Sequence, residues 1–432
     1  MKIGTLKRTL TPLLLWGLGV GYVISGMYFG WNLGLEKGGT LGMAMATLLV
    51  IILYTCFSFS YAELACAIPK AGGAYDYAER AFKQDIGFIT GLAQIIEFVF
   101  APPAIAIAIG AYFNLVVPQV PVIAAAITIY VIFTTLNIYG VKAAANFELA
   151  VTVLAVGELL LFSTLTLPHF SVTQFTHNPF PHGWAGAFAA IPFAIWFFLG
   201  IEGVANVAEE TINPQKDIIK GFGWALLTLV ILCVLVFFAS VGTGGWESIV
   251  YAADGSSSDS PLPLALGHVF ASDHIYYRLL VGIGLFGLIA SFHGLLLASG
   301  RATFEFGKIG NAPRFLGRVH SRFHTPANAL IFNSLIGVLI LCTGKTAEII
   351  IISVFGALTL YAFSMLSVIK LRKDAPEMKR PFRVPFYPLT PIVALILAIV
   401  CLVALCIDSG VLALCFFGIL LFFFLLFKIF KK

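Results

Sequence analysis

Apolar segments long enough to cross a lipid bilayer recur along almost the whole chain, and this repetition limits the fold more than any other feature of the sequence. A membrane-spanning helix needs about 20 consecutive, mostly apolar residues. The connections between the apolar segments are too short for a separate soluble domain, so we expect one transmembrane domain over residues 1–432. Twelve spans are predicted, at 11–35, 40–66, 84–117, 121–140, 144–167, 185–209, 219–245, 276–304, 326–343, 347–371, 390–408 and 410–428.

The composition agrees with a polytopic all-α membrane protein. Of the 432 residues, 59% are hydrophobic and 11% are charged, whereas soluble domains have about 45–50% apolar and about 25% charged residues. This excludes a soluble enzyme, a nucleic-acid-binding protein and a secreted disulfide scaffold. The 40 Phe and 14 Tyr also exclude a disordered chain. The seven cysteines form no C-x-x-C pair, so we expect packing residues, with no metal site and no cofactor.

The basic residues predict an orientation in the cell membrane. If the N-terminus is cytoplasmic, every Lys and Arg falls on the cytoplasmic side except Lys37, Arg278 and Lys345. Basic residues accumulate in cytoplasmic loops of membrane proteins. We therefore expect both termini in the cytoplasm. The first apolar run is too long for a signal-peptide core and has no small-residue cleavage site, so it is kept as the first span.

Two predicted spans, the first and the sixth, contain helix breaks. Residues 24–26 (Ile-Ser-Gly) lie within a glycine-rich stretch, and residues 200–203 (Gly-Ile-Glu-Gly) interrupt an apolar run. Glycine destabilises a helix interior by about 1 kcal/mol relative to alanine. Paired breaks in corresponding spans of two halves are typical of a transporter binding site. The alternative is that the glycines only allow close helix packing, which would not explain the acid at position 202.

Acidic residues inside spans are candidate functional groups, because a charge in the membrane interior is costly. Glu97 lies deep in the third span, and its helical face carries small residues: Thr90, Ala93, Ala101, Ala104, Ala108 and Ala111. Such a face meets other helices or a cavity rather than lipid. We interpret Glu97 as a partner for a cationic substrate, and the alternative is a protonated acid bonded within the bundle.

Other ionisable residues in the spans have weaker patterns. Glu202 occupies the second break, where it could titrate or bond to free backbone groups. Glu158 is predicted to be a packed, protonated acid, and His293 could carry a proton or make an interhelical hydrogen bond. Glu63 and Glu148 lie near cytoplasmic span ends, where water or the basic residues Lys70 and Lys142, respectively, could satisfy them.

Several motifs occur in order along the chain and suggest a family. They are 24–26 (Ile-Ser-Gly), 62–64 (Ala-Glu-Leu), 69–75 (Pro-Lys-Ala-Gly-Gly-Ala-Tyr), 196–202 (Trp-x-Phe-x-Gly-x-Glu) and 209–214 (Glu-Glu-Thr-x-Asn-Pro). With them, the chain resembles the amino acid–polyamine–organocation transporters along nearly its whole length. Within that group it is most similar to the ethanolamine permeases, through 25–32, 96–98 (Ile-Glu-Phe) and 291–294 (Ser-Phe-His-Gly).

The resemblance implies a leucine-transporter-like fold. Residues 11–167 would form a first repeat of five spans, residues 185–372 a second, inverted repeat, and residues 390–428 two peripheral helices. The substrate would lie between the broken spans, with Trp196 covering it and Glu202 at an inner gate or proton site. Together with the reading of the spans, this gives candidate substrate-binding residues Ile24, Ser25, Gly26, Glu97, Trp196, Phe198, Gly200 and Ile201, and candidate gating or coupling residues Glu202 and His293.

The sequence departs from the family pattern at two positions. Ile24 replaces the first glycine of the Gly-Ser-Gly that amino-acid carriers often have, and Val153 lies where several proton-coupled members have a lysine. Their coupling mechanism is therefore not carried over to this chain.

We predict a secondary active transporter, or permease, for a small amine, with ethanolamine as the first expected substrate. A proton-coupled amino acid permease is the main alternative, and a channel or a membrane-embedded enzyme is a remote one. No H-E-x-x-H or G-x-S-x-G motif and no nucleotide-binding segment occurs in the sequence, so no enzymatic activity is expected. The expected partners are the amine and the lipid bilayer. H⁺, Na⁺, uniport and exchange all remain open, and so does the oligomeric state.

Overall fold

The computed structural model describes residues 8–139, 144–252 and 254–430, and these residues form an all-helical bundle without a strand, apart from two isolated bridges. In the first half the helices are α1 (Pro12–Val23), α2 (Ser25–Tyr28), α3 (Asn32–Ala67), α4 (Ala74–Phe82), α5 (Gln84–Val116), α6 (Val122–Tyr139), α7 (Ala144–Thr166), η1 (Leu167–His169) and α8 (Val172–Phe175). In the second half they are α9 (Gly183–Ala189), α10 (Ile191–Trp196), η2 (Ile201–Glu210), α11 (Pro214–Gly244), α12 (Glu247–Val250), α13 (Pro261–Gly267), α14 (Ile275–Lys308), α15 (Ala327–Leu341), α16 (Thr346–Asp374), α17 (Leu389–Asp408) and α18 (Gly410–Phe430).

The helices have the length and composition of membrane spans. Among the described residues, ten helical segments are long and apolar enough to cross a bilayer, and α1 and α15 are shorter apolar helices. The chain is therefore a multi-pass membrane protein. Predicted and observed bounds agree closely for most spans, for example 84–117 against Gln84–Val116. The count of twelve spans and the inverted repeat stay predictions.

The first two predicted spans are divided differently in the structure. α3 starts at Asn32, within the predicted first span, and continues to Ala67. Inside this helix Gly39 has a φ of 64°, which only glycine adopts readily. A side chain at Gly39 would also collide with Pro181. The chain direction therefore changes at Gly39, so the short segment before it belongs with α1 and α2 and the long segment after it forms the second span.

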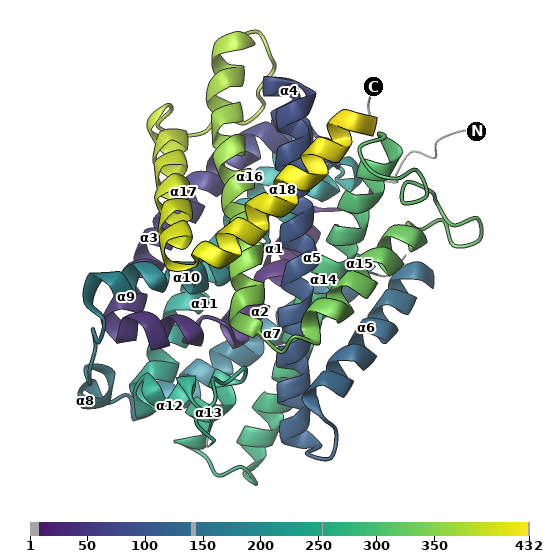
Figure 1. Ribbon diagram of the computed structural model, residues 1–432. Coiled ribbons are helices and arrows are strands. Elements are labelled where there is room, and N and C mark those ends of the chain that lie inside the picture. Colours follow the sequence, from purple (N-terminus) through teal and green to yellow (C-terminus); the bar gives the residue numbers. More distant parts are fainter. Residues whose placement is uncertain (1–7, 140–143, 253, 431–432) are drawn as a thin grey trace.

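Burial separates a central helix from peripheral ones. In the most apolar stretch of α5, 89% of residues are buried, and α5 packs against α14 and α16. The corresponding value for α18 is 22%, and this helix lies diagonally across the outside of the bundle (Figure 1). Side chains on α18 such as Leu414 are exposed and in a bilayer would face lipid. The core residues that position a site therefore come from α5 and its neighbours.

Both ends of the described chain lie at one end of the bundle, together with α4, while α8, α12 and α13 lie at the other (Figure 1). Near the start, the amides of Thr9 and Leu10 donate to the carbonyl oxygen of Glu210 at the end of η2. Near the C-terminal end of the described chain, Lys428 forms an ion pair with Asp85 at the beginning of α5. An arrangement with both termini on one side of the membrane agrees with the predicted orientation, which itself stays a prediction.

Candidate functional site

The first span is interrupted, but the sharpest change lies later than predicted. α1 begins with Thr11, whose hydroxyl accepts a hydrogen bond from Leu14 N–H, and Pro12 occupies the first turn. At Ile24 the backbone is still close to helical, so α2 follows directly. The helix is broken at Phe29, which is extended, and at Gly30, whose φ is 86°. The span is therefore divided at Ile24, within the predicted 24–26, and is fully broken about one turn later, at Phe29 and Gly30.

The second break lies where it was predicted. α10 ends at Trp196, and Gly200 has a φ of 97° before the 3₁₀ helix η2 begins at Ile201. The two breaks touch each other. A side chain at Gly26 would collide with the carbonyl oxygen of Trp196, and a Cβ at Gly30 would lie 2.5 Å from the indole nitrogen of Trp196. These glycines are needed for close approach between the two broken segments.

Aromatic rings surround the place where the breaks meet. Phe29 packs edge-on against Trp196 with 5.5 Å between ring centroids, and Trp31 stacks on Phe197 at 5.4 Å. The Trp196 indole N–H is buried and has no hydrogen-bond partner among the described residues. An unsatisfied donor in an aromatic pocket is a free group for a ligand oxygen or nitrogen.

Glu97 is buried at the contact between α5 and α16. The Ser353 hydroxyl donates to the Glu97 carbonyl oxygen at 2.9 Å, and a Cβ at Gly356 would lie 2.9 Å from the Glu97 amide nitrogen. The backbone is therefore held tightly, while neither carboxyl oxygen makes a hydrogen bond of ordinary geometry within the described part of the chain. The small residues predicted on this face are buried, except for the partly buried Ala111.

Glu202 faces Glu97, and the two carboxyl groups interact electrostatically and through a side-chain hydrogen bond. The Tyr361 hydroxyl from α16 donates to Glu202 Oε2 at 2.9 Å, and the hydroxyls of Tyr361 and Tyr54 lie 2.9 Å apart. Tyr54 also packs against Phe198 with ring centroids 5.3 Å apart. The sequence analysis did not identify Tyr54 and Tyr361 as candidate site residues. Their signal was a tyrosine in the middle of an apolar span, where the hydroxyl needs a partner.

His293 lies at a different place from Glu97 and Glu202. Its Nδ1 is 3.2 Å from Glu148 Oε2, and the rings of Phe133 and Phe147 flank it. Both side chains are buried, at 5% and 1% exposure for His293 and Glu148. The expectation that water or Lys142 satisfies Glu148 is corrected here, because the partner is His293 from α14. Lys142 lies outside the described residues.

Glu63 and Glu158 both have identified partners. Arg372 forms two 2.7 Å hydrogen bonds to the Glu63 carboxylate, Arg380 Nε lies 3.4 Å from it, and the amide of Val384 also donates to it. The expectation that water or Lys70 satisfies Glu63 is therefore wrong, because arginines beyond the tenth predicted span do. Glu158 accepts a hydrogen bond from the Tyr28 hydroxyl at 2.6 Å.

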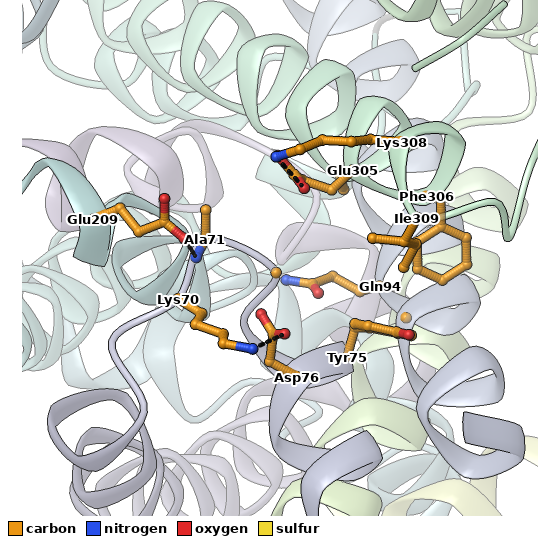
Figure 2. Close-up of a pocket in the computed structure, with 13 residues that line it drawn as sticks. Lys70, Ala71, Tyr75, Asp76, Gln94, Glu209, Glu305, Phe306, Lys308 and Ile309 are labelled. Atoms are coloured by element: carbon orange, nitrogen blue, oxygen red, sulfur yellow. Dashed lines mark hydrogen bonds and ion pairs between the residues drawn. The ribbon is translucent and has the colours of Figure 1, made fainter. Parts of the chain in front are cut away.

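A cavity of about 220 Å³ opens at the bundle end that carries α4. Its wall includes Gln94, three residues before Glu97, and charged side chains at the mouth (Figure 2). Lys70 pairs with Asp76 at 3.5 Å, and Lys308 pairs with Glu305 at 3.1 Å. The side-chain amide of Gln94 donates a 3.1 Å hydrogen bond to Asn206 of η2.

The ion pair between Lys70 and Asp76 affects the pKa of the Asp76 carboxyl, which lies outside the spans. Burial raises the pKa of the Asp76 carboxyl from 3.8, and the neighbouring Lys70 opposes this shift.

The described residues contain no group of three or more His, Cys, Asp or Glu side chains that could hold a metal ion. The buried arrangement instead offers two facing carboxyl groups, aromatic rings and an indole N–H. Such a set can bind a small organic cation and change its protonation, because carboxylates and ring faces both attract an ammonium group.

Comparison with known proteins identifies the family. A family model described as amino acid permease matches residues 10–430. An uncharacterised transporter of Rhizobium meliloti is 30% identical over 91% of this chain and 85% of its own length. The methylthioribose transporter of Bacillus subtilis is 26% identical over 91% of this chain and 87% of its own length.

Another relative is named for an amine. The low-affinity putrescine importer PlaP of Escherichia coli strain K12 is 27% identical over 89% of this chain and 86% of its own length. The match extends over nearly the whole chain and includes both broken spans. The chain therefore belongs to the amino acid permease family, within the amino acid–polyamine–organocation transporters.

Proposed function

We propose that this transporter carries a small primary amine without a carboxylate, with ethanolamine as the first expected substrate, by alternating access across the cell membrane. The observation that supports this most is the pair of facing buried acids, Glu97 and Glu202. Neither Glu97 carboxyl oxygen accepts a hydrogen bond from an N–H or hydroxyl group of the described residues, and the Glu202 carboxyl lies within hydrogen-bonding reach instead. An ammonium group between these side chains would supply the missing donors and compensate the negative charge.

The first broken span gives a second argument, against a substrate carboxylate. Amide N–H groups at a helix break can hold such a carboxylate. Here the Ser25 amide already donates to the Ser291 hydroxyl at 2.9 Å, and the Gly30 amide donates to Asn32. Ile24, in place of glycine, is fully buried beside them. An amine needs none of these donors.

The indole of Trp196 and the ring of Phe198 would cover the amine. A cation over an aromatic face gains about 0.5–2 kcal/mol. Gly200 and Ile201 would contribute the backbone of the second break, and Glu202 would act at the gate. The inverted repeats, 11–167 and 185–372, would move relative to each other, and the cavity that ends at Gln94 would be the cytoplasmic access route.

The relatives favour two substrate classes. One is named as a putrescine importer, whose cargo is an amine without a carboxylate. Others are named as a branched-chain amino acid permease and a serine/threonine exchanger. An amino acid carrier is therefore the second candidate, and a requirement for a substrate carboxylate distinguishes the two.

Uptake by reconstituted vesicles tests the proposal. Labelled ethanolamine should be taken up, and unlabelled ethanolamine or putrescine should compete with it while serine and alanine do not. Matched vesicles without protein give the passive rate. Strong competition by serine or alanine would favour the amino acid carrier, and no uptake of any amine would refute the proposed function.

The predicted orientation needs a separate experiment. A single cysteine placed in 246–275 should react with an impermeant thiol reagent added outside the cell, whereas one in 376–384 should not. The native cysteines are first removed or shown to be unreactive, because Cys342 and Cys415 are exposed. The reverse labelling pattern would invert the topology.

A further inference from the structure

The buried, hydrogen-bonded pair of Glu148 and His293 lies where three helices meet, and its place in the fold suggests a function. Glu148 belongs to α7 and His293 to α14, and both helices pack on α1. Glu148 Oε2 lies 3.2 Å from His293 Nδ1. Glu148 Oε1 is also buried but has no hydrogen-bond partner among the described residues.

That free oxygen is directed at the last turn of α1. A Cβ at Gly21 would lie 2.5 Å from Glu148 Oε1 and 2.8 Å from the Thr152 hydroxyl. Thr152 donates to the Gly17 carbonyl oxygen at 3.1 Å, and Ser291 donates to the Gly21 carbonyl oxygen at 2.6 Å. α1 is therefore attached to α7 and α14 through its own backbone, with the acid in the middle of the contact.

We propose that the Glu148–His293 pair takes up and releases a proton during transport, and that the charge of this pair determines how closely α1 packs on α7 and α14. This inference rests on the proposed function, because it names the coupling ion of the amine carrier.

The effect of the pair's charge on α1 follows from the partial charge at the C-terminal end of that helix. With one proton on the Glu148 carboxyl and a neutral His293 imidazole, the pair carries no net charge, and α1 can pack closely. When that proton leaves to water, a net negative charge remains beside the C-terminal turn of α1, where the backbone carbonyls carry a partial negative charge. Repulsion then favours a conformation with α1 further away. Because α1 leads into the first break, the binding region responds to this movement.

Other charged groups around the pair are few. α1 carries no Asp, Glu, Lys, Arg or His and presents Tyr22, which interacts with Glu148. α14 contributes His293, while its Arg301 is paired with Glu210 at 2.8 Å. α11 is free of charged residues from Gly221 to Gly244, α13 has none, and η1 has only His169. The basic side chain in contact with Glu148 is thus His293.

Val153, which the resemblance matched to a lysine, does not occupy this contact. Its side chain is 53% exposed on the outside of α7, whereas its neighbour Thr152 is fully buried against α1. The polar contact between α7 and α1 is made by Thr152 and Glu148 instead.

The first test reads protonation directly and does not depend on the substrate. Infrared difference spectra of the purified full-length protein between about pH 5 and about pH 8, the interval that brackets neutral pH, should contain a protonated-carboxyl band that Glu148→Gln removes. Glu158→Gln is the matched control, since it removes another buried acid of α7 and should keep that band. Identical spectra for the wild type and Glu148→Gln would overturn the proposal.

The second test reads coupling in vesicles that contain a pH indicator. Ethanolamine influx should acidify the lumen, and an inward proton gradient of one pH unit should drive up to about tenfold accumulation per coupled proton. Glu148→Gln should keep exchange of labelled for unlabelled amine but lose both the acidification and the accumulation. Retention of both in this variant would refute the role of the pair.

Two further outcomes keep the tests decisive. If Glu148→Gln does not fold, His293→Gln replaces it, and it should shift the midpoint of the carboxyl band by about one pH unit or more; an unshifted midpoint would overturn the proposal. If no amine crosses the membrane in the wild type, the proposed function fails, and the infrared spectra alone decide whether Glu148 titrates.

Discussion

Glu63 and Glu97 are both acids buried inside the bundle, but their surroundings are opposite. The Glu63 carboxylate accepts hydrogen bonds from Arg372 and from the Val384 amide, with Arg380 close by. The Glu97 carboxyl has no such donor within the described residues. Buried polar groups in folded proteins are nearly always paired. The comparison separates an acid that holds the structure together from one that is left available for a ligand.

Glu202 is intermediate between the two. Its carboxyl accepts a hydrogen bond from Tyr361 and also interacts with the Glu97 carboxyl and with backbone groups of the break. If the number of hydrogen-bond donors around each carboxyl distinguishes a structural acid from a functional one, substitutions at Glu63, Glu97 and Glu202 should affect different properties. Stability should suffer most at Glu63, substrate affinity most at Glu97, and pH dependence most at Glu202.

The largest effect is expected from Glu63→Gln. The change leaves the Arg372 and Arg380 guanidinium groups without their anion, and breaking a buried pair in this way costs about 3–5 kcal/mol. Thermal unfolding in detergent should show a large fall in the midpoint. Glu97→Gln is the matched variant and should leave the midpoint unchanged or raise it, because no ion pair is lost. Equal destabilisation by both substitutions would break the comparison.

The second prediction concerns affinity. If Glu97 binds the ammonium group, Glu97→Gln should weaken ethanolamine binding by about 2–5 kcal/mol, the range for removing one partner of a buried charge pair. Equilibrium binding of labelled ethanolamine measures this. Glu158→Gln should bind ethanolamine more tightly than Glu97→Gln, since Glu158 is already bonded to Tyr28. Full affinity in Glu97→Gln would remove Glu97 from the site.

Glu202→Gln should alter the pH dependence of net uptake more than it alters equilibrium binding, because the residue lies at a helix break where protonation can favour one conformation. Tyr361→Phe removes the hydrogen bond to Glu202 and should also change the pH dependence of net uptake. It should weaken ethanolamine binding by about 1 kcal/mol. Uptake is measured between about pH 5 and about pH 8, the interval that brackets neutral pH. A profile identical to the wild type in both variants would exclude Glu202 from coupling.

The sequence predicted the spans better than the contacts between them. The apolar runs determine helix bounds locally, as for the predicted span 410–428, observed as Gly410–Phe430. The partners of the buried acids lie far away in the chain. Arg372 is 309 residues from Glu63, and His293 is 145 residues from Glu148. No local pattern contains such a pairing, so Lys70 and Lys142 were chosen only because they were near in sequence.

The breaks show the same limit. The second break was predicted where it lies, because Gly200 and Gly203 interrupt an otherwise apolar run. In the first span several glycines were candidates, and only the approach of Trp196 shows that Gly30 needs a positive φ while Gly26 is required for close packing. Composition indicates that a helix can break, and tertiary contact determines at which residue it does.

The smallest effect is expected outside the spans, at Asp259 in the loop between α12 and α13. The Thr346 hydroxyl at the start of α16 donates to Asp259 at 3.2 Å, and burial raises the pKa of this carboxyl from 3.8 to about 6. A raised pKa means that the folded loop binds the proton more tightly than the unfolded chain. Its contribution to stability is therefore complete below pH 3.8 and is lost as the pH rises through about 6.

Thermal unfolding should accordingly show a loss of about 1 kcal/mol between pH 5 and pH 7 that Asp259→Asn removes, because the amide stays neutral and keeps a hydrogen-bonding oxygen. Asp254→Asn is the matched control in the same loop. The hydroxyl and amide of Ser256 hold the pKa of the exposed Asp254 carboxyl below its ordinary value, so this residue does not titrate between pH 5 and pH 7. An equal change of stability with pH in the wild type and Asp259→Asn would mean that Asp259 is ionised and compensated in the folded loop. The contrast between acids with and without hydrogen-bond donors would then apply only within the bundle.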